Sequence, residues 1–402
     1  RILHGVIRKK KLKHIRMKKN FTLIIAFISL LSFGQIPAGY YDSATGLTEY
    51  ALKSQLNKII DDQTDGHPNE YLHTDQGYSA LWTLFANGND AFKDNYYEND
   101  GTLLDMYSEN PTGSDPYNFT LVSDQCGSYS GEGDCYNREH LVPQSYFDNF
   151  QVDPMKNDPF HVAPSDGSVN GARNNLPFGV VNTANYTSQN GSKRGSNLVD
   201  IYSSYSGTVF EPLDEFKGDI ARSLFYFATR YEDLMDDFYN SANAVTCQSK
   251  NMFDGSTNKV FSDAFLLRLI KWHLDDPVSS KEIAQNNAIF SFQNNRNPFI
   301  DNPDYVCDIW PTQCATLSSQ EFILNNVAVF PNPSKNGEFS ITTTAELKNI
   351  AIYNVNGQLV QEIKNPNAIE TSTYKVNNLA TGFYMLQLQT ENASVTKKVI
   401  VN

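Results

Sequence analysis

Apolar residues recur every three or four positions in three separate stretches of the chain, which is the spacing of one face of an α-helix. Each stretch therefore predicts a helix that packs this face against a hydrophobic core. The apolar positions are Leu52, Leu56, Ile59 and Ile60 in the first stretch, Ile220, Leu224, Phe227, Tyr231 and Leu234 in the second, and Phe265, Leu269, Ile270 and His273 in the third.

The pattern changes after residue 325, where apolar and polar residues alternate as they do in β-strands. Asn356-Gly357 is a strong signal for a tight hairpin between two of these strands. The strands predict a small β-sandwich and cover Val327–Phe330, Phe339–Thr343, Ile350–Val355, Gln358–Ile363, Phe383–Leu388 and Val395–Val401. By contrast, residues 181–206 are rich in Asn, Ser and Gly and are predicted to form a loop.

The N-terminal residues have the pattern of a secretion signal. Met17 is followed by two lysines, by the apolar stretch Phe21–Leu31 and by Ser32-Phe33-Gly34, whose small residues suit a signal peptidase. We expect translation to start at Met17 and cleavage to fall between Gly34 and Gln35. A membrane anchor is the alternative interpretation of the apolar stretch, and no later stretch is long and apolar enough for a transmembrane helix.

These patterns together predict an α+β protein. Residues 1–34 are upstream sequence and signal, residues 35–315 form a mainly helical domain, residues 316–325 form a linker, and residues 326–402 form a small all-β sandwich domain.

Acidic residues outnumber basic ones and give the chain a net charge of −13 at pH 7. Residues 1–34 hold nine Lys or Arg and no acidic residue, so their removal lowers the net charge to −22. Because phosphates are bound largely through cationic side chains, such a chain binds nucleic acid only with a local basic groove or a divalent metal ion.

The five cysteines are Cys126, Cys135, Cys247, Cys307 and Cys314. An exported chain meets oxidising conditions, which favour disulfides. The short-loop pairs Cys126–Cys135 and Cys307–Cys314 are favoured and leave Cys247 free, although spacing alone leaves other pairings open. No pair has CxxC spacing, which argues against a zinc site.

Residues 135–143 contain the adjacent pair Glu139 and His140. Neighbouring residues of a regular strand point to opposite faces, so these two side chains share a site only where the strand bends. We expect a bend after His140, favoured by Pro143, to bring both side chains to one metal-centred pocket.

Residues 158–175 have the pattern of a turn that enters a helix. Ser165 or Asp166 is a suitable helix cap. Asn170 and Arg173 lie three positions apart and therefore share one face of that helix.

The residue types in these two segments match the needs of phosphodiester hydrolysis. Mg²⁺ takes oxygen ligands, which the Glu139 carboxylate and the Asn170 amide oxygen supply. A neutral His140 imidazole can take a proton from water, and Arg173 can contact a phosphate through two hydrogen bonds. Mg²⁺ is therefore the expected metal, with Ca²⁺ or Mn²⁺ as alternatives.

The string Gly131–His140 resembles the active-site strand of the endonuclease I family, a secreted and periplasmic branch of the ββα-metal nucleases, and Pro164–Asn175 resembles its metal-binding helix. Further similar segments occur in the same order at Tyr40-Tyr41, Leu104–Ser108, Gly218–Arg222 and Gln293–Asp301. The resemblance implies a ββα-metal active-site motif in which Glu139 and Asn170 bind the metal and His140 is the general base. Two features depart from the family: Phe160 stands where a His is often found, and residues 144–157 contain no Arg and only Lys156.

The resemblance also implies a nucleic acid substrate, DNA or alternatively RNA. Candidate contacts lie in or beside the similar segments and are Arg138, Asn174, Arg222, Arg230 and Arg296. For Arg222 and Arg230, ion pairing on a helix surface is the alternative interpretation.

The C-terminal residues Phe330-Pro331-Asn332-Pro333, Tyr353-Asn354 and Gly382-Phe383-Tyr384 resemble the sorting domain of the type IX secretion system. This resemblance implies export through the periplasm to the cell surface or medium, an interaction with that secretion machinery, and later removal of the domain. Two functions are therefore open. The ordered motifs favour a secreted, metal-dependent, non-specific endonuclease, and the acidic charge favours a surface-exported binding or adhesive protein without catalysis.

Overall fold

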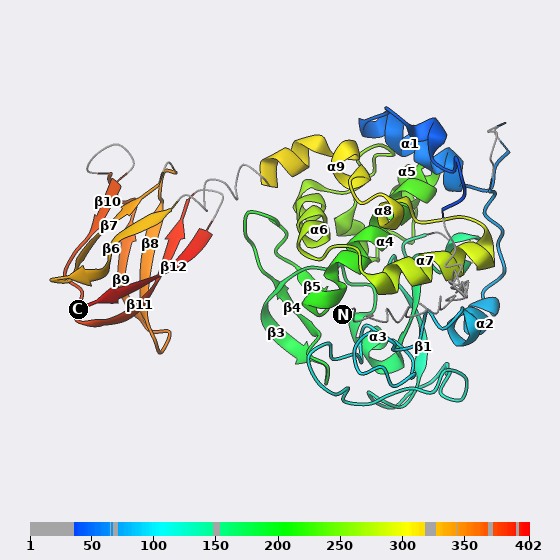
Figure 1. Cartoon of the computed structure of the whole chain (residues 1–402), viewed down its shortest axis with the longest axis horizontal. Helices are drawn as coiled ribbons and strands as arrows, with labels where there is room; N and C mark the ends of the chain where they lie inside the picture. Colours follow the sequence, from blue (N-terminus) through cyan, green and yellow to red (C-terminus); the bar gives the residue numbers. More distant parts are fainter. Residues whose placement is uncertain are drawn as a thin grey trace, which may run out of the picture. The chain divides into compact units, whose positions relative to one another are not determined.

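The computed structural model describes residues 36–64, 66, 71–147, 153–317, 327–343, 345–368, 373–390 and 394–402 (Figure 1). The predicted signal peptide and most of the predicted linker lie outside these residues. The described residues form two hydrophobic cores, one built from residues between 40 and 317 and the other from residues between 327 and 401. No described helix is long and apolar enough to cross a membrane.

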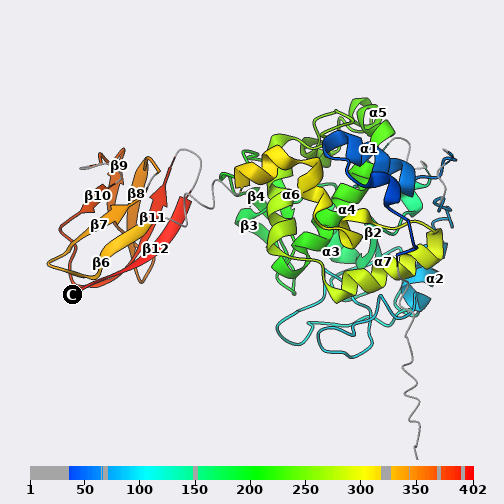
Figure 2. The same ribbon diagram turned by 45° about the horizontal axis from the view of Figure 1, so that its top comes forward.

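The larger core surrounds helix α4 (Lys217–Arg230), which runs through the middle of the domain in both ribbon views (Figures 1 and 2). Twelve of its fourteen residues are buried, as expected for a helix covered on all sides. Helices α1 (Glu49–Ile60), α6 (Asp263–Asp275) and α8 (Pro298–Asp301) contact it. The remaining helices are α2 (Ala80–Asn87), α3 (Gly167–Arg173), α5 (Met235–Asn240), α7 (Ser280–Gln293) and α9 (Tyr305–Ile309).

The three predicted helices correspond to α1, α4 and α6, and their apolar positions face the core. The second helix ends earlier than its apolar positions predicted. Tyr231 follows the last residue of α4, and Leu234 belongs to a short 3-10 turn.

The loop predicted over residues 181–206 is wrong for much of its length, because it contains two strands. Strands β3 (Val181–Thr187) and β4 (Lys193–Asn197) form an antiparallel hairpin that β5 (Thr208–Glu211) extends to three strands. A Cβ atom on Gly195 would lie 2.0 Å from the carbonyl oxygen of Thr183, so the close approach of β3 to β4 requires glycine there.

The C-terminal residues form an all-β unit of seven strands, as predicted in kind. Its strands are β6 (Ala328–Lys335), β7 (Glu338–Thr342), β8 (Asn349–Asn354), β9 (Leu359–Lys364), β10 (Thr373–Val376), β11 (Gly382–Gln389) and β12 (Ser394–Val401). The group β10-β7-β6 joins the group β12-β11-β8-β9 through a parallel pairing of Ser334 with Val401. Both groups contribute side chains to one core, and the predicted hairpin at Asn356-Gly357 connects β8 to β9.

Candidate active site

Two strands and one helix bring the two chemically suited segments together. Strand β1 (Tyr136–His140) pairs antiparallel with β2 (Val162–Asp166), and α3 follows β2 directly and contacts both strands. The Asp166 carboxylate accepts a hydrogen bond of 2.8 Å from the Val169 N–H, so Asp166 is the helix cap. The segment that was predicted as a turn before the helix is thus the strand β2.

Glu139 is buried beneath α3 and is 1% exposed. Its Oε1 accepts a hydrogen bond of 3.0 Å from the Tyr107 hydroxyl and lies 3.1 Å from Nη1 of Arg173. Burial raises the pKa of Glu139 to about 7, while the Arg173 charge and the Tyr107 hydrogen bond act in the opposite direction. The cation and the hydroxyl therefore favour the ionised carboxylate that a metal ligand requires.

Arg173 is also buried, with 1% exposure. Its Nη1 and Nη2 donate to the carbonyl oxygens of His140 and Leu141, each at 2.7 Å. The predicted contact of Arg173 with a phosphate does not fit this burial, because its guanidinium is held by protein groups. Arg173 instead positions Glu139 and fixes α3 against the end of β1.

Asn170 lies against the same side of β1 as Glu139. Its Nδ2 donates to Oδ1 of Asn137 at 2.7 Å and to the carbonyl oxygen of Arg138 at 3.3 Å. Asn137 and Glu139 are two positions apart in a strand and therefore share this face. The Glu139 carboxylate and the Asn170 amide oxygen are hard oxygen donors of the kind that a divalent cation such as Mg²⁺ binds, and Asn137 holds the Asn170 amide group.

The His140 ring has partners of its own, distinct from those of Glu139. Nε2 lies 3.0 Å from the carbonyl oxygen of Lys156, and Nδ1 lies 3.2 Å from Nε2 of Gln144. Because a carbonyl oxygen only accepts, Nε2 carries the proton and Nδ1 is the nitrogen that can accept one. Burial, followed by the neighbouring His161, lowers the pKa of His140 to about 3, so the ring is neutral at physiological pH.

The bend expected after His140 does not bring the two side chains into contact. The β1 strand is regular through His140, and its alternation places the His140 ring beside Tyr78, with ring centroids 5.8 Å apart, while Glu139 contacts Tyr107.

Two cationic side chains accompany the His140 ring. The Arg138 guanidinium lies 3.5 Å from the centroid of the Tyr78 ring, and the Lys156 ammonium lies 5.0 Å from it. Both residues are half-buried, and both cations lie at the Tyr78 ring that packs beside His140. Asn174 is exposed at the C-terminal end of α3, where its backbone N–H donates to the carbonyl oxygen of Asn170.

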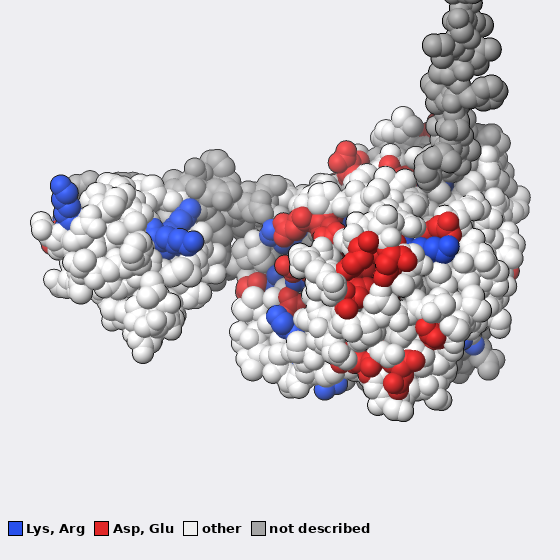
Figure 3. Space-filling view, turned by 60° about the horizontal axis from the view of Figure 1, so that its bottom comes forward, with Lys and Arg blue, Asp and Glu red and all other residues white. Residues whose placement is uncertain are grey.

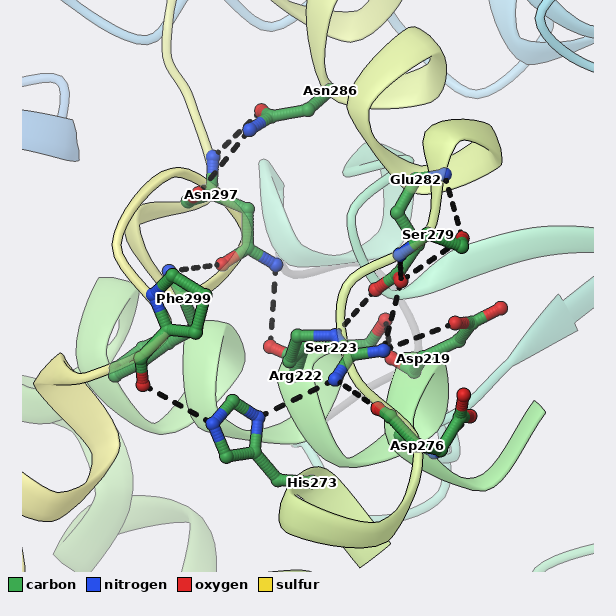
Figure 4. A network of polar contacts seen from close by, with 12 residues as sticks. Asp219, Arg222, Ser223, His273, Asp276, Ser279, Glu282, Asn286, Asn297 and Phe299 are labelled. Carbon is green, nitrogen blue, oxygen red and sulfur yellow. Dashed lines mark hydrogen bonds and ion pairs between the residues drawn. The ribbon is translucent and has the colours of Figure 1, made fainter. Parts of the chain in front are cut away.

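The other predicted nucleic-acid contacts, Arg222, Arg230 and Arg296, are 0%, 5% and 1% exposed. Arg222 is enclosed by Glu282, Asp219 and the carbonyl oxygen of Asp276 (Figure 4). Arg296 pairs with Asp301, and Arg230 lies 3.3 Å from Asp62. A buried, ion-paired guanidinium is not available to a phosphate, so these three arginines have a structural role instead. The alternative of ion pairing thus holds for Arg222 and Arg230, although inside the domain and not on its surface.

The cysteines pair as favoured by the sequence. Disulfides join Cys126 to Cys135 and Cys307 to Cys314, while Cys247 is free and buried. The loop closed by the first disulfide places the Tyr129 ring over α3. A Cβ atom on Gly171 would lie 2.1 Å from the Tyr129 hydroxyl, so a larger residue there would have to displace this exposed ring from α3.

Several residues of the site were not singled out from the sequence. Tyr107 lies in a segment that resembles the family, but nothing in its spacing relates it to Glu139. Asn137 lies inside the first segment, and Gln144 and Lys156 lie beside the two segments; only the folded arrangement shows that they contact Asn170 and His140. The signal for Asn137 was its position two residues before Glu139 in a strand.

The surface of the domain is strongly acidic. Figure 3 shows a large group of Asp and Glu side chains on one face, with few Lys or Arg among them. Cations near β1 must therefore act locally, against the general negative potential of the domain.

Comparison with known proteins gives two matches that together span most of the chain. Residues 48–304 match the family described as Endonuclease I, and residues 328–402 match the family described as a secretion system C-terminal sorting domain. The chain is 31% identical over 275 residues to an extracellular ribonuclease of Bacillus subtilis (strain 168), which covers 68% of this chain and 78% of the relative. It is 32% identical over 274 residues to an extracellular ribonuclease of Bacillus amyloliquefaciens, which covers 67% of this chain and 78% of the relative.

Among solved structures, the sulfur carrier protein SoxY from Chlorobium limicola f thiosulfatophilum aligns with 14% identity and a TM-score of 0.13. The alignment covers 19% of this chain and 77% of that protein, and a likeness this low carries no argument.

Proposed function

We infer, because the chain belongs to the endonuclease I family, that it is a secreted endonuclease that hydrolyses the phosphodiester bonds of DNA and RNA with one divalent metal ion. The chain is a nuclease, and its sorting domain directs it to the cell surface or the medium. The alternative of an exported binding protein without catalysis is set aside by the family. Activity on RNA is suggested by the names of the two Bacillus relatives.

The observation that carries the proposal is the state of the His140 ring. The Lys156 carbonyl oxygen accepts a hydrogen bond from Nε2–H, which leaves Nδ1 as the nitrogen that can accept a proton. A water molecule that replaces Gln144 at Nδ1 can transfer a proton to this nitrogen as it attacks phosphorus. Arg138 and Lys156 lie where they can contact the phosphate on this side of β1.

Glu139 and Asn170 are the residues that hold the metal ion in this proposal. When bound, Mg²⁺ neutralises charge on the phosphate and on the departing oxygen. Arg173 and Tyr107 keep the Glu139 carboxylate oriented, and Asn137 holds the Asn170 amide so that its oxygen is available.

Cleavage kinetics of the His140→Ala variant test the assignment of the base. We expect kcat to fall by roughly 10²–10⁴ while metal affinity and substrate affinity stay near their original values. His273→Ala is the matched control, because His273 has the same 6% exposure and its Nε2 also lies near a backbone carbonyl oxygen, that of Pro303. Equal losses of kcat in the two variants would show that His140 acts through the fold and not as the base.

Metal titrations of the Glu139→Ala and Asn170→Ala variants test the metal site separately. We expect weaker metal binding in calorimetry and partial recovery of cleavage with excess Mg²⁺. DNA and RNA gels with and without EDTA compare the two substrates directly. Undiminished cleavage in EDTA would contradict the metal requirement.

A further inference from the structure

A second group of acidic side chains lies outside the site on β1 and α3. Oxygen atoms of Asp94, Glu98 and Glu109 all lie within 4.8 Å of one another. In the described part of the chain this is the one set of three acidic, histidine or cysteine residues with such spacing. Asp94 and Glu109 are each 1% exposed, and Glu98 is exposed to solvent.

Glu109 is the unusual member, because neither of its buried carboxylate oxygens accepts a hydrogen bond from a described residue. Asp94 differs, since its carboxylate accepts hydrogen bonds from the backbone N–H groups of Tyr96, Tyr97 and Asn99. A buried, unpaired carboxylate is costly unless a cation or a donor satisfies it. Burial, followed by the negative charges of Asp115 and Asp94, raises the pKa of Glu109 to about 9.

We propose that Asp94, Glu98 and Glu109 bind one Ca²⁺ ion in addition to the metal of the active site. Ca²⁺ binds oxygen atoms at about 2.3–2.6 Å, so two of its ligands lie at most roughly 5 Å apart. The three side chains satisfy this limit without moving. Exposed Glu98 gives the ion a path from solvent and leaves room for the water ligands that complete its coordination.

The position of Glu109 links this cation to the rest of the domain. The segment Asp105–Glu109 contacts the active-site elements at two points: Oδ2 of Asp105 accepts a hydrogen bond of 2.7 Å from the N–H of Asp166, and the Tyr107 hydroxyl donates to Glu139. Ca²⁺ at Glu109 therefore stabilises the segment that supports the N-terminus of α3 and the Glu139 carboxylate.

The test measures Ca²⁺ binding without using cleavage as the readout. The full chain with Glu139→Ala, which removes a ligand of the other proposed site, is freed of metal with EDTA and titrated with CaCl₂ by calorimetry. We expect one Ca²⁺ per chain with a dissociation constant of about 10⁻⁴–10⁻³ M, the range of extracellular calcium sites. Adding Glu109→Gln should weaken binding at least roughly tenfold, whereas adding Asp237→Asn, at an exposed carboxylate of α5, should leave it unchanged.

Thermal unfolding gives a second readout that distinguishes a cation site from a merely buried acid. In EDTA, Glu109→Gln should unfold at the same or a higher temperature than the parent, because burial raises the pKa of Glu109 and forces its carboxyl to take up a proton on folding, which the glutamine does not need. In CaCl₂ the order should reverse, since only the parent binds the ion. The proposal is overturned if Ca²⁺ stabilises both proteins equally or neither, and tighter binding of Mg²⁺ than of Ca²⁺ would overturn the choice of ion.

Discussion

His161 makes the stability of the nuclease domain depend on pH. The residue is 0% exposed, its Nε2 lies 2.5 Å from the carbonyl oxygen of Met155, and its buried Nδ1 has no hydrogen-bond partner among the described residues. The ring packs against Phe227 with centroids 4.7 Å apart. Burial lowers the pKa of His161 from 6.5 to about 4, although the charge of Asp158 acts in the opposite direction.

The sign and size of the effect follow from this shift. Between pH 6.5 and pH 4 the unfolded chain binds a proton at His161 and the folded chain does not, so the free energy of unfolding falls as the pH falls. At about 1.4 kcal/mol per pKa unit, the loss on going from roughly pH 7.5 to pH 5 is about 2 kcal/mol for this one residue. Stability at this residue is fully present above pH 6.5.

Urea unfolding of the parent and of His161→Gln at these two pH values isolates this contribution. The glutamine can still donate to the Met155 carbonyl oxygen but does not titrate. All three tryptophans lie between residues 82 and 310, so their fluorescence reports unfolding of this domain. His273 titrates in both proteins and cancels in the comparison, whereas His140 cancels only in part, because His161 contributes to the lowering of the His140 pKa.

The parent should lose about 2 kcal/mol more than His161→Gln between the two pH values, whatever the variant costs at pH 7.5. Equal losses in the two proteins would refute the reasoning and would mean that His161 is protonated in the folded state. Cleavage at pH 7.5 by the folded variant should stay close to that of the parent, because His161 lies outside the proposed catalytic group.

Three further predictions concern charge and covalent structure. Arg222→Ala leaves its buried carboxylate partner unpaired and should lower the free energy of unfolding by about 3–5 kcal/mol, as measured by urea unfolding, without changing the nucleic-acid affinity of the folded fraction. Arg138→Ala and Lys156→Ala should each weaken DNA binding and lower the slope of log affinity against log salt by about 1, as measured by fluorescence anisotropy; an unchanged slope would place the phosphate contacts elsewhere. Cys135→Ser opens the loop before β1 and should cost about 2–4 kcal/mol in thermal unfolding, with lower activity; peptide mapping that found both thiols free in the secreted parent would remove the basis of this prediction.

The helices that line the core were predictable, because periodic apolar residues such as Leu56 and Leu224 report burial directly. The hairpin of β3 and β4 was missed although it carries the same Asn-Gly signal, Asn190-Gly191, as the hairpin that was predicted at Asn356-Gly357. Its β3 residues are largely exposed and polar, so no alternation of apolar residues marks the strand. Strands held by backbone pairing alone leave little trace in side-chain patterns.

Resemblance and chemistry singled out Glu139, His140 and Asn170 from the sequence, and their roles stay a prediction. The burial of Arg222 and Arg296 could not be predicted in this way. An arginine at a motif looks the same in sequence whether its guanidinium meets solvent or a buried carboxylate. Only long-range packing distinguishes the exposed arginine from the buried one. The contact between Glu282 and Arg222, which are sixty residues apart in the sequence, is an example.

The loop between Cys126 and Cys135 has a consequence for the cell that makes the enzyme. This loop lays Tyr129 on α3 and leads into β1, so its disulfide constrains both elements of the site. Thiols stay reduced in the cytoplasm and become oxidised only after export. We therefore expect the newly made chain to lack this constraint while it shares a compartment with the chromosome and ribosomes of its producer. The Cys126–Cys135 disulfide therefore forms only after the chain has left the compartment that contains the chromosome of the producing cell.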